Sequence, residues 1–396
     1  MLVVILFIMA YLFLPVIGEF LIYLDGGYSV APGKVDASLV AANLVFCIVL
    51  IFVAYIVAYS FQRDKIFRFG VKYEERTLNR IIVAMIFVAM FVFLIAGYKF
   101  LVLGVPRGQL RVGFGWYGFI YKWVVQYLTP ALLCLAGYIY RFGSGAKGQG
   151  KKVASIFLLA VLVGVFTGYK SVVVTVTLPF GAIMASKGID IKKLALALGF
   201  MIVALIFTTA LVRGIAYSEA IAFLVYRLTT MTAYGAIAVW EYFPNGGGED
   251  AFKLAYGVLG NNLASLLAGG AASDYGFLYH NISKLMTYLA YANHQGAVDG
   301  TTNITVTSFG EAVYMLGDFY LLYAIVSGLI VGGVLRLILS GLSGGRISSV
   351  MSLVFLFMVI LPWFNSGGIF SLISIPVWIW MLSTQTMILL IVKGRW

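Results

Sequence analysis

Charge is what this sequence has least of. Asp, Glu, Lys and Arg make up 11% of its 396 residues, whereas a soluble domain carries roughly 25%. Cysteine and histidine occur twice each. Neither a C-x-x-C nor an H-E-x-x-H pattern is present, so we expect no disulfide framework and no metal site. A P-loop is also missing, which argues against an ATP-driven pump, and we expect no cofactor.

Long apolar runs take the place of charge. Hydrophobic residues make up 62% of the chain. Runs of about 17–25 residues recur, and each can cross a hydrocarbon core of about 30 Å as a helix. The runs are continuous rather than alternating with a period of two, which excludes an outer-membrane barrel. The sequence therefore predicts an all-α, polytopic membrane protein. We expect about ten transmembrane helices, near residues 1–23, 38–60, 81–104, 117–140, 153–169, 171–186, 194–212, 309–335, 348–364 and 369–391.

Basic residues are distributed unevenly between the links that join these spans. With the N-terminus inside, the links 61–80, 141–152, 187–193 and 336–347 and the tail after 391 face the cytoplasm. They hold 17 of the 27 Lys and Arg residues but 4 of the 15 Asp and Glu residues. This is the positive-inside pattern of a cytoplasmic face. The net charge of +12 is therefore a topology signal, and we expect cytoplasmic termini and no nucleic-acid partner.

One link is far longer than the others. Residues 213–308 separate an N-terminal membrane part, 1–212, from a C-terminal one, 309–396, and the same topology places them outside the cytoplasm. The loop is too apolar to be disordered. We expect three short helices that lie on, or dip into, the outer leaflet, over residues 220–242, 251–267 and 275–291. Residues 220–240 are also long enough to form a span, but a single extra crossing would reverse the last basic links.

Several cations gather at the predicted outer side. A charge close to the membrane core is costly, so each is a functional candidate. Arginine suits phosphate because its planar fork donates two parallel hydrogen bonds. The alternative is that these cations pair with Glu219, Glu241 or Asp274, or with anionic lipid. The candidate phosphate-binding residues are Arg107, Arg111, Lys170, Arg213 and Arg227.

Lys99 and Lys122 lie inside predicted spans, within a few residues of an outer end. Their long side chains can carry the charged end to the interface. A charge inside a span is also a functional candidate by default. The sequence leaves both interpretations open.

Two residues near the end of the loop are candidates for acid–base chemistry. His294 lies in the polar, glycine-bearing phrase Tyr291-Ala292-Asn293-His294-Gln295-Gly296. Glu311 follows Gly310 at the start of a predicted span, where a carboxylate can also stabilise the helix N-terminus. We keep both roles open for Glu311.

At this point the sequence resembles a family. The phrase Asn303-Ile304-Thr305-Val306-Thr307-Ser308-Phe309-Gly310-Glu311-Ala312, followed by Met315-Leu316-Gly317, resembles the end of the large periplasmic loop in Wzy-type polymerases of O-antigen and exopolysaccharide repeat units. Thr167-Gly168-Tyr169-Lys170-Ser171 resembles the family's "TGSR" hairpin. Lys170 stands where the family commonly has Arg, which keeps the charge but loses the bidentate fork.

The resemblance implies a bacterial inner-membrane glycosyltransferase with a GT-C-like fold and a large periplasmic loop. It would transfer a glycan from undecaprenyl diphosphate to a lipid-linked acceptor, without a metal ion. Arg213 would stabilise the charge that develops on the leaving diphosphate, with Arg227, Lys170, Arg107 and Arg111 binding the same group. His294 or Glu311 would act as the base. The implied partners are lipid-linked oligosaccharides, membrane lipids and a chain-length regulator.

Other functions remain open at this stage. The O-antigen ligases share this architecture and also place Arg and His residues around a comparable loop. A secondary transporter or flippase is a different class, but such proteins show internal repeats and midplane polar residues, and we see no repeat between the halves. A non-catalytic scaffold would explain the loop but not its basic clustering.

Overall fold

The computed structural model describes most of the chain. The described residues are 2–25, 34–60, 75–105, 114, 117–143, 148–186, 199, 203, 206–207, 209–210, 214–260, 281–291, 304–343 and 348–393. Every regular element within them is a helix, which confirms the all-α prediction for this part of the chain.

The first half of the chain forms long apolar rods. Two of the rods change from α- to π-helical winding and back without a break, and such single-turn π-bulges occur frequently at functional sites. The elements are α1 (Leu2–Leu24), α2 (Ala37–Ser60), α3 (Glu75–Val92), η1 (Phe93–Gly97), α4 (Tyr98–Leu101), α5 (Tyr117–Trp123), η2 (Val124–Leu128), α6 (Thr129–Phe142), α7 (Gln149–Phe166) and α8 (Lys170–Met184).

The second half is more broken. Short helices precede the long α16, and the last apolar stretch divides into several pieces. The elements are α10 (Tyr217–Leu228), α11 (Thr230–Tyr242), η3 (Gly248–Leu259), α13 (Ile282–Tyr291), α15 (Ser308–Leu316), η5 (Gly317–Phe319), α16 (Tyr320–Ser343), α17 (Ser348–Phe355), η6 (Leu356–Ile360), α18 (Leu361–Ser366), η7 (Ile369–Ile373) and α19 (Ile375–Lys393).

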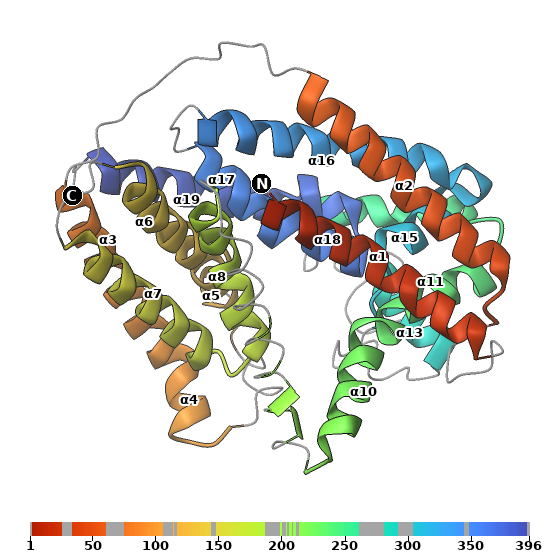
Figure 1. Cartoon of the computed structure of the whole chain (residues 1–396), viewed down its shortest axis with the longest axis horizontal. Coiled ribbons are helices and arrows are strands. Elements are labelled where there is room, and N and C mark those ends of the chain that lie inside the picture. The colour runs from red at the N-terminus through yellow and green to blue at the C-terminus, as the bar shows by residue number, and fades with distance from the viewer. Residues whose placement is uncertain are drawn as a thin grey trace.

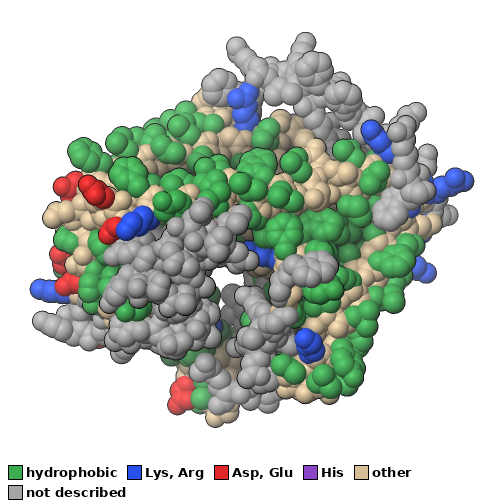
Figure 2. Space-filling model, turned by 180° about the vertical axis from the view of Figure 1, so that it is seen from behind, with side chains coloured by type: hydrophobic (Ala, Val, Ile, Leu, Met, Phe, Trp, Pro, Cys, Tyr) green, Lys and Arg blue, Asp and Glu red, His purple; other side chains and the backbone are tan. Residues whose placement is uncertain are grey.

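Within the described residues, nine helical stretches are long and apolar enough to cross a membrane. Eight of them overlap predicted spans. The predicted span 171–186 corresponds to the shorter apolar helix Val172–Met184, and most of the predicted span 194–212 lies outside the described residues. Figure 2 shows hydrophobic side chains over much of the outer surface and charged ones mainly towards its edges. The chain is a multi-pass helical membrane protein.

The ninth stretch, Tyr217–Tyr242, differs from the prediction of surface helices in the loop. Its second half, α11, is buried and packs against α1 and α15. Gly235 allows this close approach, because a Cβ at that position would lie 2.1 Å from the Thr305 carbonyl oxygen. Small residues at helix contacts are typical of membrane bundles. Within the described residues α11 therefore belongs to the packed core rather than to the surface of the bundle.

The helix ends that flank the basic links lie at one end of the molecule. Gly328 lies against Leu50, and Gly332 against Ala54, so α16 and α2 run in the same direction. At the end of α19, its last turn accepts a hydrogen bond from Arg80 near the start of α3. Figure 1 shows the ends of α6, α16 and α19 and the start of α3 on one side. The described helix ends that flank these links therefore lie on one side of the bundle.

The helices form two groups that do not follow chain order (Figure 1). One group contains α3 and α5–α8, which pack on one another. The other contains α1, α2, α11, α15 and α16, so the first two helices pack mainly with the last part of the loop and the C-terminal part. The stretch α17–η6–α18 contacts both groups, and α19 packs on the first group and on α17.

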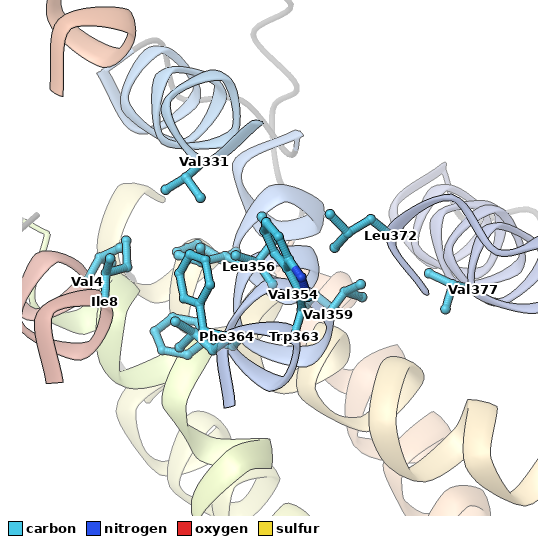
Figure 3. Packing of buried hydrophobic residues seen from close by; sticks show 14 of the residues in the cluster. Val4, Ile8, Val331, Val354, Leu356, Val359, Trp363, Phe364, Leu372 and Val377 are labelled. Carbon is cyan, nitrogen blue, oxygen red and sulfur yellow. The ribbon is translucent and has the colours of Figure 1, made fainter. Parts of the chain in front are cut away.

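The centre of the core is built around α18. Trp363 and Phe364, on this helix, are each 1% exposed. Figure 3 shows Phe364 on the side of Val4 and Ile8 of α1, and Trp363 on the side of Leu372. Full burial of large aromatic side chains fixes α18 in position, and this helix forms part of the site.

Candidate functional site

A cavity of about 490 Å³ lies beside the first helix group. Residues from α5, η2 and α8 of that group line one side, and residues from η3, α13, the segment 304–305, η6, α18 and η7 line the rest. Much of its lining comes from the end of α5, η2, the starts of α8 and α19 and the end of α18, which lie away from the basic end of the bundle. The protein therefore has a space of ligand size at the end opposite the basic links.

The cavity lining is more apolar than polar, and most of its polar side chains are neutral. Hydroxyl and amide side chains recur on several walls, including Gln126, Thr175, Asn281, Ser283 and Thr305. Among the described lining residues, Lys122 is the one that carries a charge. Neutral donors and acceptors of this kind suit a ligand that is rich in hydroxyl groups, while the ammonium suits an anionic group.

Aromatic rings hold the Lys122 side chain at the wall. Its Nζ lies 5.0 Å from the ring centroid of Trp380, on α19. Tyr127 packs on the same ring with centroids 5.3 Å apart. The neighbouring Trp123 donates from Nε1 to the Thr384 Oγ1 at 2.9 Å. A cation over an indole face is stabilised by the ring quadrupole, and these contacts place the ammonium on the cavity side of α5.

A second wall is formed where α18 ends. Gly367 and Gly368 have φ values of 68° and 92°, a region that is strained for residues with a Cβ. They turn the chain from α18 into η7, and both line the cavity together with Trp363. A Cβ on Gly367 would lie 3.0 Å from the Val306 carbonyl oxygen. This tight double-glycine turn lets the backbone itself form part of the cavity surface.

Glu311 holds this wall from behind. The carboxyl group is 0% exposed. Its Oε2 accepts hydrogen bonds from the Tyr323 hydroxyl and from the Trp363 Nε1 at 3.0 Å, and its Oε1 accepts one from the Ile369 backbone N–H at 2.8 Å. Glu311 does not line the cavity, but two of its donors belong to the segment that does. A carboxylate that accepts several bonds in a dry site fixes the groups that donate to it.

The N-terminus of α15 is capped by another residue. Thr307 Oγ1 accepts a hydrogen bond from the Gly310 N–H at 3.3 Å, as an N-cap threonine does. The Glu311 carboxylate points instead to α16, α18 and η7. Its hydrogen bonds are thus made across the bundle rather than to the turn in which it lies.

Helix α13 is joined to the same wall by hydroxyl groups. Ser283 Oγ donates to the Ser366 carbonyl at 2.8 Å and accepts from the Val306 N–H. Thr287 Oγ1 accepts from the Ile304 N–H at 2.7 Å. The predicted loop therefore contributes a wall of the cavity directly, because these bonds attach α13 to residues 304–306 and to the end of α18.

Two of the predicted site residues have described side chains. Glu311 lies behind the cavity wall, and Arg227 lies exposed on α10, with its guanidinium 6.0 Å from the Phe223 ring centroid and outside the cavity lining. Lys170 begins α8, whose following turns line the cavity, but its side chain lies outside the described part. Arg107, Arg111, Arg213 and His294 lie outside the described residues altogether.

The structure adds residues that sequence reasoning did not select. Lys122 carried a signal, since it was one of two cations inside the predicted spans. The pair Gly367-Gly368 was visible as a break after an apolar run. Trp363 and Tyr323 carried no signal, because their partner, Glu311, is 52 and 12 residues away in the chain.

Comparison with known proteins gives no family for the chain: no family model, no curated protein and no solved structure matches it. Among the described residues, no group of three or more His, Cys, Asp or Glu side chains could hold a metal ion. The functional argument therefore depends on the cavity and on the residues around it.

Proposed function

We propose that the protein polymerises lipid-linked oligosaccharide repeat units, transferring a glycan from undecaprenyl diphosphate to a hydroxyl of a lipid-linked acceptor at the periplasmic face of the inner membrane. The observation that supports it best is the cavity beside the first helix group. Its hydroxyl and amide lining suits sugars, and its single described cation suits phosphate. In the proposed orientation it opens away from the basic, cytoplasmic end.

The reaction needs no external energy source. The bond between the sugar C1 and the diphosphate oxygen breaks, and a bond from C1 to the acceptor oxygen forms. The acceptor proton passes to a base, for which His294 is the candidate, and undecaprenyl diphosphate leaves. Arg213 stabilises the charge on the leaving group, with Arg107, Arg111, Lys170 and Arg227 as further binding residues. Removing one such donor commonly costs about 10²–10³-fold in rate.

In this proposal Glu311 is a positioning residue. Its carboxylate is enclosed behind the wall and accepts bonds from the groups that shape the cavity. The Gly310-Glu311 phrase, on which the resemblance to the polymerases rests, would then preserve the shape of the site rather than supply a proton acceptor.

Purified protein supplied with undecaprenyl-diphosphate-linked repeat units should yield a ladder of longer glycans. Arg213→Ala should reduce chain elongation by about 10²-fold or more, whereas Arg76→Ala, an exposed residue at the opposite, basic end, should leave it unchanged. The protein is not a polymerase if intact substrate is consumed or moved without new glycosidic bonds. Transfer to lipid A-core in place of a second repeat unit would identify a ligase.

A transporter of lipid-linked or free saccharides is the second candidate. One observation favours it: the cavity lies beside the discontinuous stretch α18–η7–α19. Broken helices around a binding site are typical of secondary transporters. Movement of a labelled repeat unit across proteoliposomes, without any increase in glycan length, would favour this function over polymerisation.

A further inference from the structure

The charge within the cavity lining lies on one helix. Lys122 and Gln126 belong to the continuous rod α5–η2 and line the cavity at successive turns. The hydroxyl and amide groups of Asn281, Ser283 and Thr305 belong to α13 and the segment before α15. The described lining therefore offers a cationic wall and a separate neutral polar wall within one space of about 490 Å³.

The position of Lys122 suits an anion that carries an apolar tail. The ammonium lies within a candidate span, Tyr117–Phe142, where an ionisable side chain is a functional candidate by default. Its aromatic neighbours, Tyr127 and Trp380, are nearly buried, at 3% and 5% exposure. Lys122 itself is exposed, so a phosphate group on a hydrophobic carrier can reach its ammonium from the surrounding bilayer, beside these aromatic rings.

We propose that Lys122 binds a phosphate group of a polyprenyl-diphosphate-linked substrate, with the first sugar units against the wall formed by Asn281, Ser283 and Thr305. This assignment rests on the proposed function and adds a binding residue to it. A lysine acts here as a point charge with rotatable donors. Charge therefore matters more at this position than the shape of the side chain.

Binding measurements on the purified full-length protein in detergent test the assignment. The probes are undecaprenyl diphosphate, undecaprenol and inorganic pyrophosphate. Undecaprenyl diphosphate should bind at least about tenfold more tightly than undecaprenol, which corresponds to about 1.4 kcal/mol. Lys122→Met should remove that difference and leave the affinity for undecaprenol unchanged. Lys122→Arg should keep it within about threefold, because the charge is retained.

Lys151→Met is the matched control, because Lys151 is an exposed lysine at the start of α7, at the opposite end of the bundle. It should change neither affinity. Equal affinity of the native protein for the two carriers, or undiminished diphosphate binding by folded Lys122→Met, would overturn the assignment. Displacement of the lipid by equimolar pyrophosphate would also overturn it, since the site would then recognise soluble phosphates. If Lys122→Met does not fold, Lys122→Gln replaces it in the same comparison.

The same variants separate this inference from the proposed function. Diphosphate binding that depends on Lys122, without any glycan ladder from native protein, would retain the phosphate site and reject polymerisation. A ladder of normal length and rate from Lys122→Met would retain polymerisation and reject the site.

Discussion

Two buried glutamates, on α15 and on α1, are bound in very different ways. Glu311 and Glu19 are each 0% exposed. Glu311 accepts hydrogen bonds on both oxygens from three separate elements. Glu19 accepts one bond on Oε1, from the Asn43 Nδ2 at 2.7 Å, and its Oε2 has no partner within the described part of the chain.

The difference shows that burial alone does not define a carboxylate's role. Every donor around Glu311 would be left unsatisfied in a dry core if the carboxylate were removed, and each such group costs about 1–3 kcal/mol. Glu19 has one donor to lose, and its other oxygen is itself an unsatisfied buried group. Glu311 therefore holds three elements together. Burial of Glu19 destabilises the fold locally, and the hydrogen bond from Asn43 partly offsets that loss. Isosteric substitutions should separate the two.

The largest expected effect is that of Glu311→Gln. An amide NH₂ would face donors such as the Trp363 Nε1 and could not accept from them, so we expect a loss of about 3 kcal/mol or more. Thermal unfolding in detergent measures it, with Glu249→Gln on the exposed face of η3 as the control. A melting temperature equal to that of the control would show that the network around Glu311 contributes little.

Trp363→Phe should have a smaller effect, since it removes a single donor from Glu311. The expected loss is about 1–2 kcal/mol, because part of it reflects the smaller ring. A double-mutant cycle with Glu311→Gln isolates the hydrogen bond, and the two losses should be clearly less than additive. Strict additivity would mean that the two side chains do not act together.

Asp36 is an exposed carboxylate that also accepts hydrogen bonds from its neighbours. Its Oδ1 accepts from the Leu39 N–H at 2.9 Å and the Ser38 hydroxyl at 2.7 Å at the start of α2. The Leu39 N–H and then the Ser38 hydroxyl lower the pKa of this carboxyl below its ordinary value. Asp36→Ala should cost about 0.5–1 kcal/mol.

The pH dependence of that contribution has a definite sign. Because the folded-state pKa of Asp36 is lowered, the stabilisation is present above the unfolded-state pKa of about 3.9 and is lost as the pH falls through the folded value. The stability difference between native protein and Asp36→Ala should therefore shrink below about pH 4. A difference that grows on acidification would contradict this reasoning.

The smallest expected effect is that of Glu19→Gln. An amide keeps an acceptor for Asn43 and removes a buried carboxyl, so the stability should stay within about 0.5 kcal/mol of native or rise slightly. Unfolding under the conditions used for Glu311→Gln measures it. A loss as large as that of Glu311→Gln would show that Glu19 has a strong partner and would remove the contrast between the two sites.

The sequence predicts the helices better than their packing. Apolar length predicts α2, which spans Ala37–Ser60 against an expected 38–60, and the α17–α18 stretch, which spans Ser348–Ser366 against an expected 348–364. It does not predict that α11 is buried, because an Ala- and Gly-rich helix gives no strong signal until its partner is known. The glycine that allows its close approach, Gly235, meets a carbonyl 70 residues further along, at Thr305.

The site shows the same limit. Glu311 could be selected from the sequence because a carboxylate beside a span is rare. Its partners could not be selected, since Ile369 lies 58 residues away and donates from its backbone. Likewise, Lys122 could be recognised as a charge inside a span. Whether its ammonium lies at the membrane interface or at the cavity depends on the position of Trp380, which the sequence does not give. Long-range contacts of this kind leave no periodic pattern in one chain.

The grouping of helices has a consequence for the order of synthesis. α1 and α2 leave the ribosome before α11 and α16, whose surfaces they cover. At a synthesis rate of about 5–20 residues per second, the interval between the synthesis of α2 and that of α16 lasts roughly ten seconds to a minute. During that time the hydrogen bond between Glu19 and Asn43 can keep the first two helices together in lipid, since such bonds stabilise helix pairs by about 0.6–2 kcal/mol. The contact between Glu19 and Asn43 would then matter more while the chain is being synthesised than in the folded protein.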